Sequence, residues 1–471
     1  MGNPFRQLAR DSVVYGLSTV VQRLLTFLLT PLYTNVLTPA ELGDVAQLYS
    51  LMALASVLAT SGFEQAFMRY WVEDDKRRGV ITHAVGGVAT VAVLIAGIGA
   101  AAAPVIASSL VLSSTRGAAL VRLAFAIVAL DAVATIPLAM LRMERRAMLF
   151  ASLRVLSVVV NVAFNILLVS LWQWGVDGVM IAGLVSSLVA SLLATPLVLP
   201  HIGGSFDRTM LGILLRFGLP TVPASLAAMI VQVADRPILG WLAGGTSVGI
   251  YNANYRLAIP MMLAVSVFET AWRPLYLQHA SDSDIGTLLA RAMRYFIAGA
   301  TALFTIVTLF IGDVVAIPIG SGHLIGAQYW SGLGVVPIVM AGYIALGLIT
   351  TMVASILITK RTTLLPLIYG IAALTNVVLN VLLIPLLGYI GAAWATFGAY
   401  AVGAVATSFL SRRVLAVPYP WWSIVQAAGI CIAVGIVNTL FPQQGMLWVK
   451  AVAALAACGG AYWIGRFNAT R

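Results

Sequence analysis

Long apolar runs follow one another along almost the whole chain, and they constrain its fold more than any other feature. Fourteen of them approach or exceed the roughly 20 residues that a helix needs to cross a bilayer. They lie near 12–34, 41–70, 80–107, 117–142, 147–170, 176–199, 209–239, 247–272, 290–312, 331–358, 363–385, 389–411, 420–441 and 446–465. Only 9% of the 471 residues are charged. The sequence therefore predicts an all-α integral membrane protein.

Basic residues gather in alternate connections between these runs. The basic connections carry Arg6 and Arg10; Lys76, Arg77 and Arg78; Arg142, Arg145 and Arg146; Arg208; Arg273 and Arg291; Lys360 and Arg361; Arg412 and Arg413; and Arg466 and Arg471. The positive-inside rule assigns them, with both termini, to the cytoplasmic side. The same residues account for the net charge of +11, so we expect a membrane surface rather than nucleic acid as their partner.

Several classes of protein are excluded by what lies between the runs. No connection exceeds about twenty residues, which is too short for a soluble catalytic domain. The nucleotide motif G-x-x-x-x-G-K-[ST] is absent, which argues against an ATP motor. The four histidines lack metal-ligand spacing, and Cys431 and Cys458 lie in apolar runs. We therefore expect a transporter rather than an enzyme, without cofactor or metal.

The chain contains an internal repeat. At an offset of 206 residues, Pro31 matches Pro237, Gly43 matches Gly249, Tyr49 matches Tyr255 and Leu51 matches Leu257. "GFEQAFMRYW" (62–71) is echoed by "FETAWRPLY" (268–276), and "NVAFN" (161–165) by "NVVLN" (376–380). Helices one to six thus recur as helices seven to twelve. An even number of helices per copy gives both copies the same orientation, as in transporters with parallel repeats.

This repeat predicts the domain organisation. The first lobe spans 1–203 and the second 204–412, with "PHIGGSFDR" (200–208) at their boundary. The last two helices, in 413–471, lie outside the duplication.

Four motifs in order along the chain resemble a known family. They are "LTPAELGDVAQLYSL", "GFEQAFMRYW", "ADRPILG" with "GIYNANYRL", and "NVVLNVLLIPLLGYIGAAWAT". Together they resemble the multidrug/oligosaccharidyl-lipid/polysaccharide (MOP) exporter superfamily, and within it the polysaccharide transport branch with the Wzx-type O-antigen flippases. The resemblance covers essentially the full chain.

The resemblance implies both a fold and a function. It implies two six-helix lobes in a V around a central cavity, plus two C-terminal helices. It implies alternating access that moves an undecaprenyl-pyrophosphate-linked glycan from the inner to the outer leaflet of the bacterial inner membrane. The implied partners are this lipid-linked glycan, membrane lipid, a glycan polymerase and a chain-length regulator, and we expect a monomer.

Two arginines within the predicted helices are candidates for substrate binding. Arg23 lies about 11 residues into the first helix, and Arg256 about two and a half turns into the eighth. Charges inside a membrane are costly and mark functional sites, and arginine binds phosphate oxygens bidentately. The first copy has Ser50 at the position of Arg256, as expected for an asymmetric ligand. Related lipid II flippases carry cavity arginines on the matching helices. The alternative is that each pairs with a carboxylate, with Asp131 a partner for Arg23 or an ion-coupling site.

Two further sets of polar residues have either a structural or a gating interpretation. Asp235 and Arg236 fall near one end of the seventh helix, and as adjacent residues about 100° apart they are not expected to pair with each other. They could form a gate contact or pack the helix end. The pairs Asn161 and Asn165, and Asn376 and Asn380, stand one turn apart. Interhelical hydrogen bonding is favoured for them over sugar contact.

The duplicated glutamates Glu64 and Glu269 fall at the cytoplasmic ends of helices two and eight. Arg69 is five residues after Glu64 and faces it poorly, whereas Arg273 is four residues after Glu269 and can face it. A cytoplasmic gate is one interpretation, and fixing helix ends within each lobe is the other.

Two other functions remain open at this point. A cation-coupled multidrug antiporter of the same superfamily would use a carboxylate in the first lobe, and the first helix carries Arg23 instead. A membrane glycan polymerase or ligase would need an extended outer loop with catalytic Arg or His. The outer loops here are short and nearly uncharged.

Overall fold

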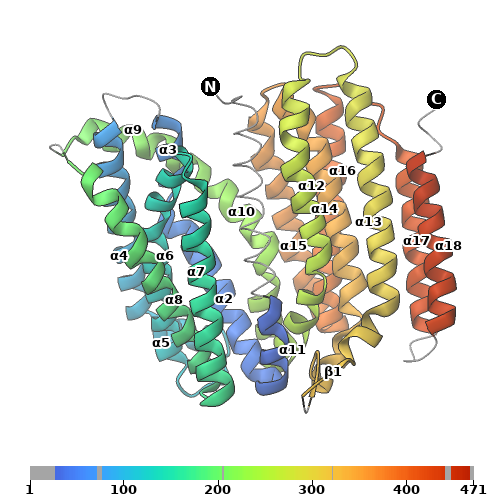
Figure 1. Cartoon of the computed structure of the whole chain (residues 1–471), viewed down its shortest axis with the longest axis horizontal. Helices are drawn as coiled ribbons and strands as arrows, with labels where there is room; N and C mark the ends of the chain where they lie inside the picture. The colour runs from blue at the N-terminus through green and yellow to red at the C-terminus, as the bar shows by residue number, and fades with distance from the viewer. Residues whose placement is uncertain (1–26, 72–76, 204–205, 321, 441–446, 467–471) are drawn as a thin grey trace. The chain divides into compact units, whose positions relative to one another are not determined.

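The computed structural model describes residues 27–71, 77–203, 206–320, 322–440 and 447–466 (Figure 1). Residues 27–36 are helical and lead into α2. The helices that follow are α2 (Pro39–Thr60), α3 (Phe63–Tyr70), α4 (Arg77–Ala101), α5 (Ala103–Ser109), α6 (Gly117–Met143), α7 (Ala147–Asn165), α8 (Gly175–Val198), α9 (Arg208–Gly218), α10 (Val222–Val233), α11 (Asp235–Leu257), α12 (Ile259–Gln278), α13 (Ile285–Val315), α14 (Val335–Ile358), α15 (Leu365–Leu387), α16 (Tyr389–Arg412), α17 (Trp421–Leu440) and α18 (Leu447–Arg466). A hairpin of β1 (Pro318–Ile319) and β2 (Gly322–His323) precedes α14.

Twelve helical segments of the described chain are long and apolar enough to cross a membrane. They coincide with twelve of the fourteen predicted helices. Most of the first predicted helix lies outside the described residues. The eighth is present as the second part of α11 followed by α12, which carries Glu269 and Arg273. The prediction of an all-α membrane protein is confirmed.

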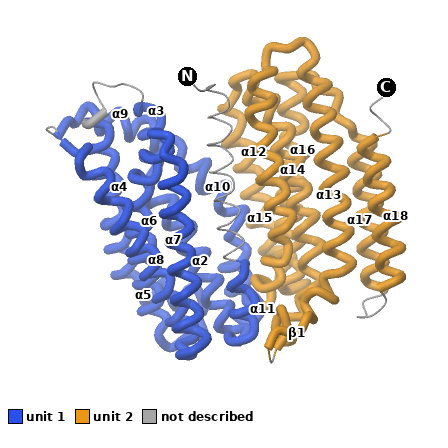
Figure 2. The backbone as a smooth tube through the Cα atoms, in the orientation of Figure 1, with its two compact units in different colours: residues 1–249 blue, residues 250–471 orange. Residues whose placement is uncertain are grey.

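The chain packs into two compact units that divide at Gly249 (Figure 2). Unit 1 comprises residues 1–249, and unit 2 comprises residues 250–471. The division falls within α11, which has a non-helical residue at Gly244 (φ 81°, ψ 164°). The lobe boundary predicted from the repeat lies earlier, near residue 203, and stays a prediction.

Helix α6 is the centre of unit 1. It packs against α2, α4 and α8, while α7 lies along α8. The side chains of α6 that face these neighbours are small or branched apolar residues, among them Leu120, Ala124 and Val128, and all three are fully or almost fully buried. Other positions of α6 carry Asp131, Thr135 and Arg142, which line the cavity described below.

The turn between α6 and α7 recurs between α14 and α15 of unit 2. Arg145 has φ 56° and Lys360 has φ 59°, an unusual left-handed conformation for residues with a Cβ. The next residue donates its backbone N–H to the carbonyl five residues earlier in both copies, from Arg146 to Leu141 at 2.9 Å and from Arg361 to Ile356 at 3.0 Å. The matched backbone geometry supports the duplication inferred from the sequence.

Two glycines matched by the repeat allow α2 and α11 to cross at backbone contact within unit 1. A Cβ on Gly43 would lie 2.0 Å from the carbonyl oxygen of Gly245, and a Cβ on Gly249 would lie 1.8 Å from that of Pro39. Both clashes would be with backbone, which cannot move aside as a side chain can. Glycine is therefore required on both sides of the crossing.

Unit 2 repeats the same kind of helix packing and adds two helices. Helices α14, α15 and α16 form its closely packed centre, and α17 and α18 pack against α13. Lys450 of α18 is 2% exposed, and its Nζ lies 2.6 Å from Oδ2 of Asp313 on α13. This ion pair holds α18 against α13. Separating the two helices would leave a buried lysine without its partner, at a large cost in free energy.

Candidate functional site

Unit 1 contains a polar cavity of about 270 Å³ between α3, α6, α7 and α8. Two carboxylates and two guanidiniums line it, together with two hydroxyl groups and a ring of apolar side chains. The lining residues are Glu64, Asp131, Ala134, Thr135, Leu138, Arg142, Phe150, Leu153, Arg154, Ser157 and Ala190. Four charged residues around one cavity are exceptional in helices otherwise built for lipid.

The break between α2 and α3 brings Glu64 to this cavity. Helix α2 ends at Thr60, and the two residues that follow it, Ser61 and Gly62, both have positive φ. A Cβ on Gly62 would lie 2.2 Å from the carbonyl oxygen of Gly218 on α9. Only glycine therefore fits at position 62 of this turn. Helix α3 then starts in a new direction, with Glu64 in its first turn.

Glu64 forms an ion pair with Arg142 of α6. Arg142 lies in the last turn of α6, where a cation is also favoured by the helix dipole. Its guanidinium lies 5.9 Å from the ring centre of Phe150, and so does that of Arg154 on α7. The aromatic ring therefore stabilises two cations that would otherwise repel each other.

Arg154 and Asp131 are less fully paired than Arg142 and Glu64. The Arg154 guanidinium makes no hydrogen bond or ion pair with any residue that the structure describes, although the backbone carbonyl of Arg154 accepts from the Ser157 hydroxyl at 3.1 Å. The Asp131 carboxylate lines the same cavity as the Arg154 guanidinium, which attracts it, and it forms no ion pair with a described residue. The cavity is thus lined by one guanidinium and one carboxylate that form no ion pair with any described residue.

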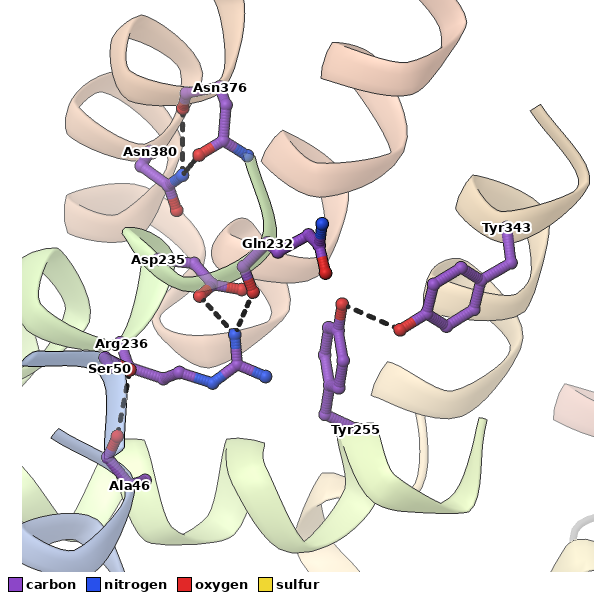
Figure 3. A network of polar contacts seen from close by, with 9 residues as sticks. All are labelled: Ala46, Ser50, Gln232, Asp235, Arg236, Tyr255, Tyr343, Asn376 and Asn380. Carbon is purple, nitrogen blue, oxygen red and sulfur yellow. Dashed lines mark hydrogen bonds and ion pairs between the residues drawn. The ribbon is translucent and has the colours of Figure 1, made fainter. Parts of the chain in front are cut away.

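The structure describes only one of the two arginines predicted to bind substrate. Arg23 lies outside the described residues. Arg256 is half-buried in α11, two residues after the buried Asn254, whose amide donates to the carbonyl of Tyr329 at 2.8 Å. The counterpart Ser50 is buried and donates to the carbonyl of Ala46 at 2.9 Å, within its own helix (Figure 3). The substrate-binding role of Arg23 and Arg256 stays a prediction.

The prediction that Asp235 and Arg236 would not pair with each other is wrong. Nη1 of Arg236 lies 2.7 Å from Oδ1 of Asp235 and 2.6 Å from the carbonyl oxygen of Gln232 (Figure 3). The angular argument assumed one continuous helix, but α10 ends at Val233 and α11 begins at Asp235. At this break the long arginine side chain folds back over the aspartate. A gate role for the pair remains a prediction.

The duplicated glutamates have different surroundings within their units. Glu64 pairs with Arg142, whereas Arg69 is exposed and lies over Tyr70, 5.9 Å from its ring centre. In the described part of unit 2, Glu269 and Arg273 form no ion pair with each other, although their spacing allows one. The gate interpretation for these four residues stays a prediction.

The asparagine pairs have the same internal geometry in the two units. The amide of Asn165 donates to the carbonyl and the side-chain oxygen of Asn161 at 2.8 and 3.1 Å. Asn380 donates to Asn376 at the same two distances. Asn165 also accepts from the Tyr33 hydroxyl at 2.8 Å, a contact between helices as expected for a structural role.

Arg142 and Arg154 are the cavity residues that sequence reasoning missed. Arg142 was interpreted only as an orientation signal in a basic connection, and Arg154 was not singled out. Its signal was nevertheless available, because Arg154 is a charge inside an apolar run. Within the described ranges, no group of three or more His, Cys, Asp or Glu residues could hold a metal ion.

Comparison with known proteins identifies one matching family model. The model described as polysaccharide biosynthesis protein matches residues 8–278. No curated protein sequence matches the chain.

Several solved structures share the fold. "Lipid II flippase MurJ, inward closed conformation" has a TM-score of 0.79 and 13% identity, with 98% of this chain and 100% of that chain covered. An inward-facing multidrug resistance MATE family transporter of the MOP superfamily has a TM-score of 0.66 and 16% identity, with 83% and 94% covered. An outward-facing structure of a transporter of that family has a TM-score of 0.60 and 17% identity, with 88% and 96% covered.

Proposed function

Because the chain belongs to the polysaccharide biosynthesis protein family, we propose that it is a flippase for a lipid-linked oligosaccharide. In this proposal it moves an undecaprenyl-pyrophosphate-linked repeat unit of an O-antigen or exopolysaccharide from the inner to the outer leaflet of the bacterial inner membrane by alternating access. Both termini face the cytoplasm. The similarity in fold to a lipid II flippase supports a lipid-linked cargo.

The observation that carries the proposal is the half-buried Arg256 inside a helix of a chain of this family. A pyrophosphate offers several anionic oxygens, and a guanidinium meets two of them at once without losing its proton. Arg256 and Arg23 are the proposed pyrophosphate ligands. Neither is duplicated, whereas structural features such as the asparagine pairs are. A ligand with one pyrophosphate needs such an asymmetric pair of sites.

The test is surface polysaccharide in a strain that lacks the native gene and carries a plasmid copy. Arg23→Ala and Arg256→Ala should each abolish surface polysaccharide, while immunoblots show the protein in the membrane fraction. Arg256→Lys should retain part of the activity, because lysine keeps the charge and loses the bidentate fork. Arg122→Ala is the matched control, because Arg122 lies exposed on α6 and, among the described residues, its side chain hydrogen-bonds to the carbonyl of Ala100.

Normal polysaccharide in both alanine variants would contradict the proposed site. A purified protein that moves a cationic dye across liposomes but moves no lipid-linked oligosaccharide would favour the multidrug antiporter instead. Accumulation of unpolymerised repeat units on the outer face of the deletion strain would indicate a polymerase or ligase, because flipping would then proceed without the protein.

A further inference from the structure

The fifth and eleventh predicted helices, which are equivalent by the repeat, differ at their ends by a short insertion. Nine residues separate Asn165 from Gly175 in the first copy, whereas seven separate Asn380 from Gly388 in the second. The two glycines correspond to each other, because their φ angles are 56° and 58° and a further glycine stands three residues after each. The first copy therefore has Trp-Gln-Trp, residues 172–174, where the second copy has a single leucine.

The backbone holds this insertion in an unusual conformation. Residues Ile166–Leu171, directly after α7, form a π-helical segment, a rare element that is frequent at functional sites. The N–H groups of both tryptophans donate back to carbonyls of this segment, at 3.0 and 2.9 Å. Gln173 has φ 55°, and a left-handed residue with a Cβ costs on the order of 1 kcal/mol. The equivalent helix α15 stays α-helical to Leu387, so the fold does not require the strained conformation.

The side chains of Trp172 and Trp174 form one aromatic platform. Their ring centres lie 5.2 Å apart, with 45° between the ring planes. Trp172 is 53% exposed and Trp174 is 46% exposed. A pyranose ring presents a face of C–H groups, and these suit the electron-rich face of an indole ring. The aromatic platform therefore has the form and the exposure to stack on a sugar.

Polar groups stand next to the aromatic platform. Asp177 lies three residues after Trp174 in the first turn of α8, and its Oδ1 is 3.2 Å from Nη1 of the exposed Arg116. The carboxylate of Glu41 approaches the same loop, since a Cβ on Gly175 would lie 3.0 Å from its Oε1. Oε2 of Glu41 closes the capping box of α2, whereas Oε1 accepts no hydrogen bond from a described residue. Such carboxylates accept hydrogen bonds from hydroxyl groups, and a guanidinium donates to them.

The aromatic platform lies at the outer end of its span in the predicted orientation. The span Ala147–Leu171 has 25 residues, about 37 Å at ~1.5 Å per residue, which exceeds the ~30 Å of hydrocarbon in a bilayer. The turn before it carries Arg145 and Arg146, which the positive-inside rule assigns to the cytoplasm. Tryptophans at the opposite end commonly anchor a helix in the interface. Anchoring requires neither a strained insertion nor neighbouring polar groups, so it does not account for this site.

We propose that the aromatic platform binds a pyranose ring of the transported glycan on the outer side of the membrane. The indole rings stack on the C–H face of the sugar, and Glu41 and Asp177 accept hydrogen bonds from its hydroxyl groups. The site deepens the proposed function, because it contacts the sugar whereas the proposed arginines contact the pyrophosphate. The choice of ligand rests on that function, and the geometry rests on unit 1 alone.

The test is saturation-transfer-difference NMR on the purified full-length protein in phospholipid nanodiscs, without sugar-based detergents. Aromatic protons of the protein are irradiated, which phospholipids lack, so the transferred signal identifies sugar protons that lie close to aromatic rings. The first probe is the single repeat unit, released by mild acid from the lipid extract of the deletion strain. The second consists of fragments of two or more repeats from the surface polysaccharide of the parent strain. We expect a signal from the C–H protons of the single repeat unit, and none with empty nanodiscs.

Variants assign the binding to the aromatic platform. Trp172→Leu and Trp174→Leu keep an apolar side chain for the interface and lose the indole face. Each should raise the Kd of the single repeat unit about tenfold, which corresponds to about 1.4 kcal/mol and lies within the range for aromatic contacts. Trp172→Phe should give an intermediate value, because it keeps a smaller ring. Trp448→Leu is the matched control, since Trp448 is an exposed tryptophan at the start of α18, on the same predicted side, and it should leave the Kd unchanged.

Gel filtration and circular dichroism establish that each variant is folded. Where a leucine variant does not fold, the phenylalanine variant at the same position replaces it, with an expected increase in Kd of about threefold, or about 0.7 kcal/mol.

Three results would overturn the proposal. The first is the absence of any signal from the single repeat unit with the wild-type protein. The second is an unchanged Kd in the folded tryptophan variants, which would place the binding elsewhere. The third is a signal from the polysaccharide fragments alone, which would make the ligand the finished polymer rather than the cargo. The flippase proposal is judged separately, by surface polysaccharide in the Arg23 and Arg256 variants, so a failure of either proposal is recognised by its own readout.

Discussion

The helix pair α6–α7 of unit 1 and the helix pair α14–α15 of unit 2 have matching backbone geometry at their turns but differ in their charged side chains. Their turns have the same left-handed residue, Arg145 or Lys360, and the same hydrogen bond after it. Their asparagine pairs have identical distances. Yet α6 and α7 carry four charged residues, whereas α14 and α15 carry none.

The difference separates what the fold requires from what one unit adds. A turn, an asparagine pair and a close glycine crossing persist in both copies because packing depends on them. The ion pair of Glu64 with Arg142 and the neighbouring Asp131 and Arg154 occur once. Duplicated features are therefore the better guide to structure, and single features the better guide to ligand binding.

The largest effect is expected where the duplicated packing is broken. Gly43→Ala and Gly249→Ala should each destabilise the protein by about 3 kcal/mol, at the upper end for overpacking, because the added methyl group meets rigid backbone. The loss of stability is measured by gel filtration, as the fraction of protein that stays in the monodisperse peak after heating in detergent. As equivalents, the two variants should respond alike, and a difference of more than about 1 kcal/mol between them would contradict the symmetry. Gly429→Ala is the control, because a Cβ at this position would have no atom of a described residue within 4 Å.

The charged pair should give the next largest effect and only in unit 1. Arg142→Leu copies the residue of the second copy and leaves Glu64 without its partner, which should cost about 2 kcal/mol for a partly exposed pair. Glu64→Gln together with Arg142→Leu should restore part of the loss, as a double-mutant cycle would show. Glu269→Gln, at the exposed equivalent position, should change the thermal stability little.

A smaller effect is expected at the asparagine pairs. Tyr33→Phe removes the hydroxyl that donates to Asn165 and should cost about 1 kcal/mol in thermal unfolding. The internal geometry of the pair should survive, since the two asparagines bond each other. An unchanged melting temperature would show that the contact between helices contributes nothing, and that the pairs act only within their own helices.

The smallest effect is expected in the loop that follows the first copy. Asp207 caps α9, and the backbone N–H of Thr209 lowers the pKa of its carboxyl group below the usual value of 3.8. The ionised carboxylate of Asp207 therefore stabilises the folded protein above about pH 4. This contribution is lost as the pH falls through the lowered pKa of Asp207 and the carboxylate is protonated. Asp207→Asn should remove this part of the pH dependence, measured as the difference in melting temperature between pH 3 and pH 6.

The sequence was sufficient for the framework of the protein and for part of its chemistry. Apolar runs and a repeat of short motifs predicted the helices and their duplication, because both depend on local patterns. The cavity depends on which helix faces are turned towards each other. Its ion pair joins Glu64 and Arg142, which are 78 residues apart in the sequence, so no local pattern predicts it. The Asp235 and Arg236 pair was missed for a related reason, since the break between α10 and α11 has no strong local signal.

The crossing of α2 and α11 also bears on how the chain arose. Position 43 of one copy contacts Gly245, and position 249 of the other contacts Pro39, which are themselves equivalent by the offset of the repeat. Such reciprocal contacts are the mark of an isologous interface with a two-fold axis. A shorter ancestor with a single copy could have made the same crossing by pairing with itself, with one glycine codon serving both sides of the axis. In the duplicated chain each side of the crossing has its own glycine codon, so the copies can differ elsewhere, as they do at Asp131 and Leu346, while both glycines of the crossing are kept.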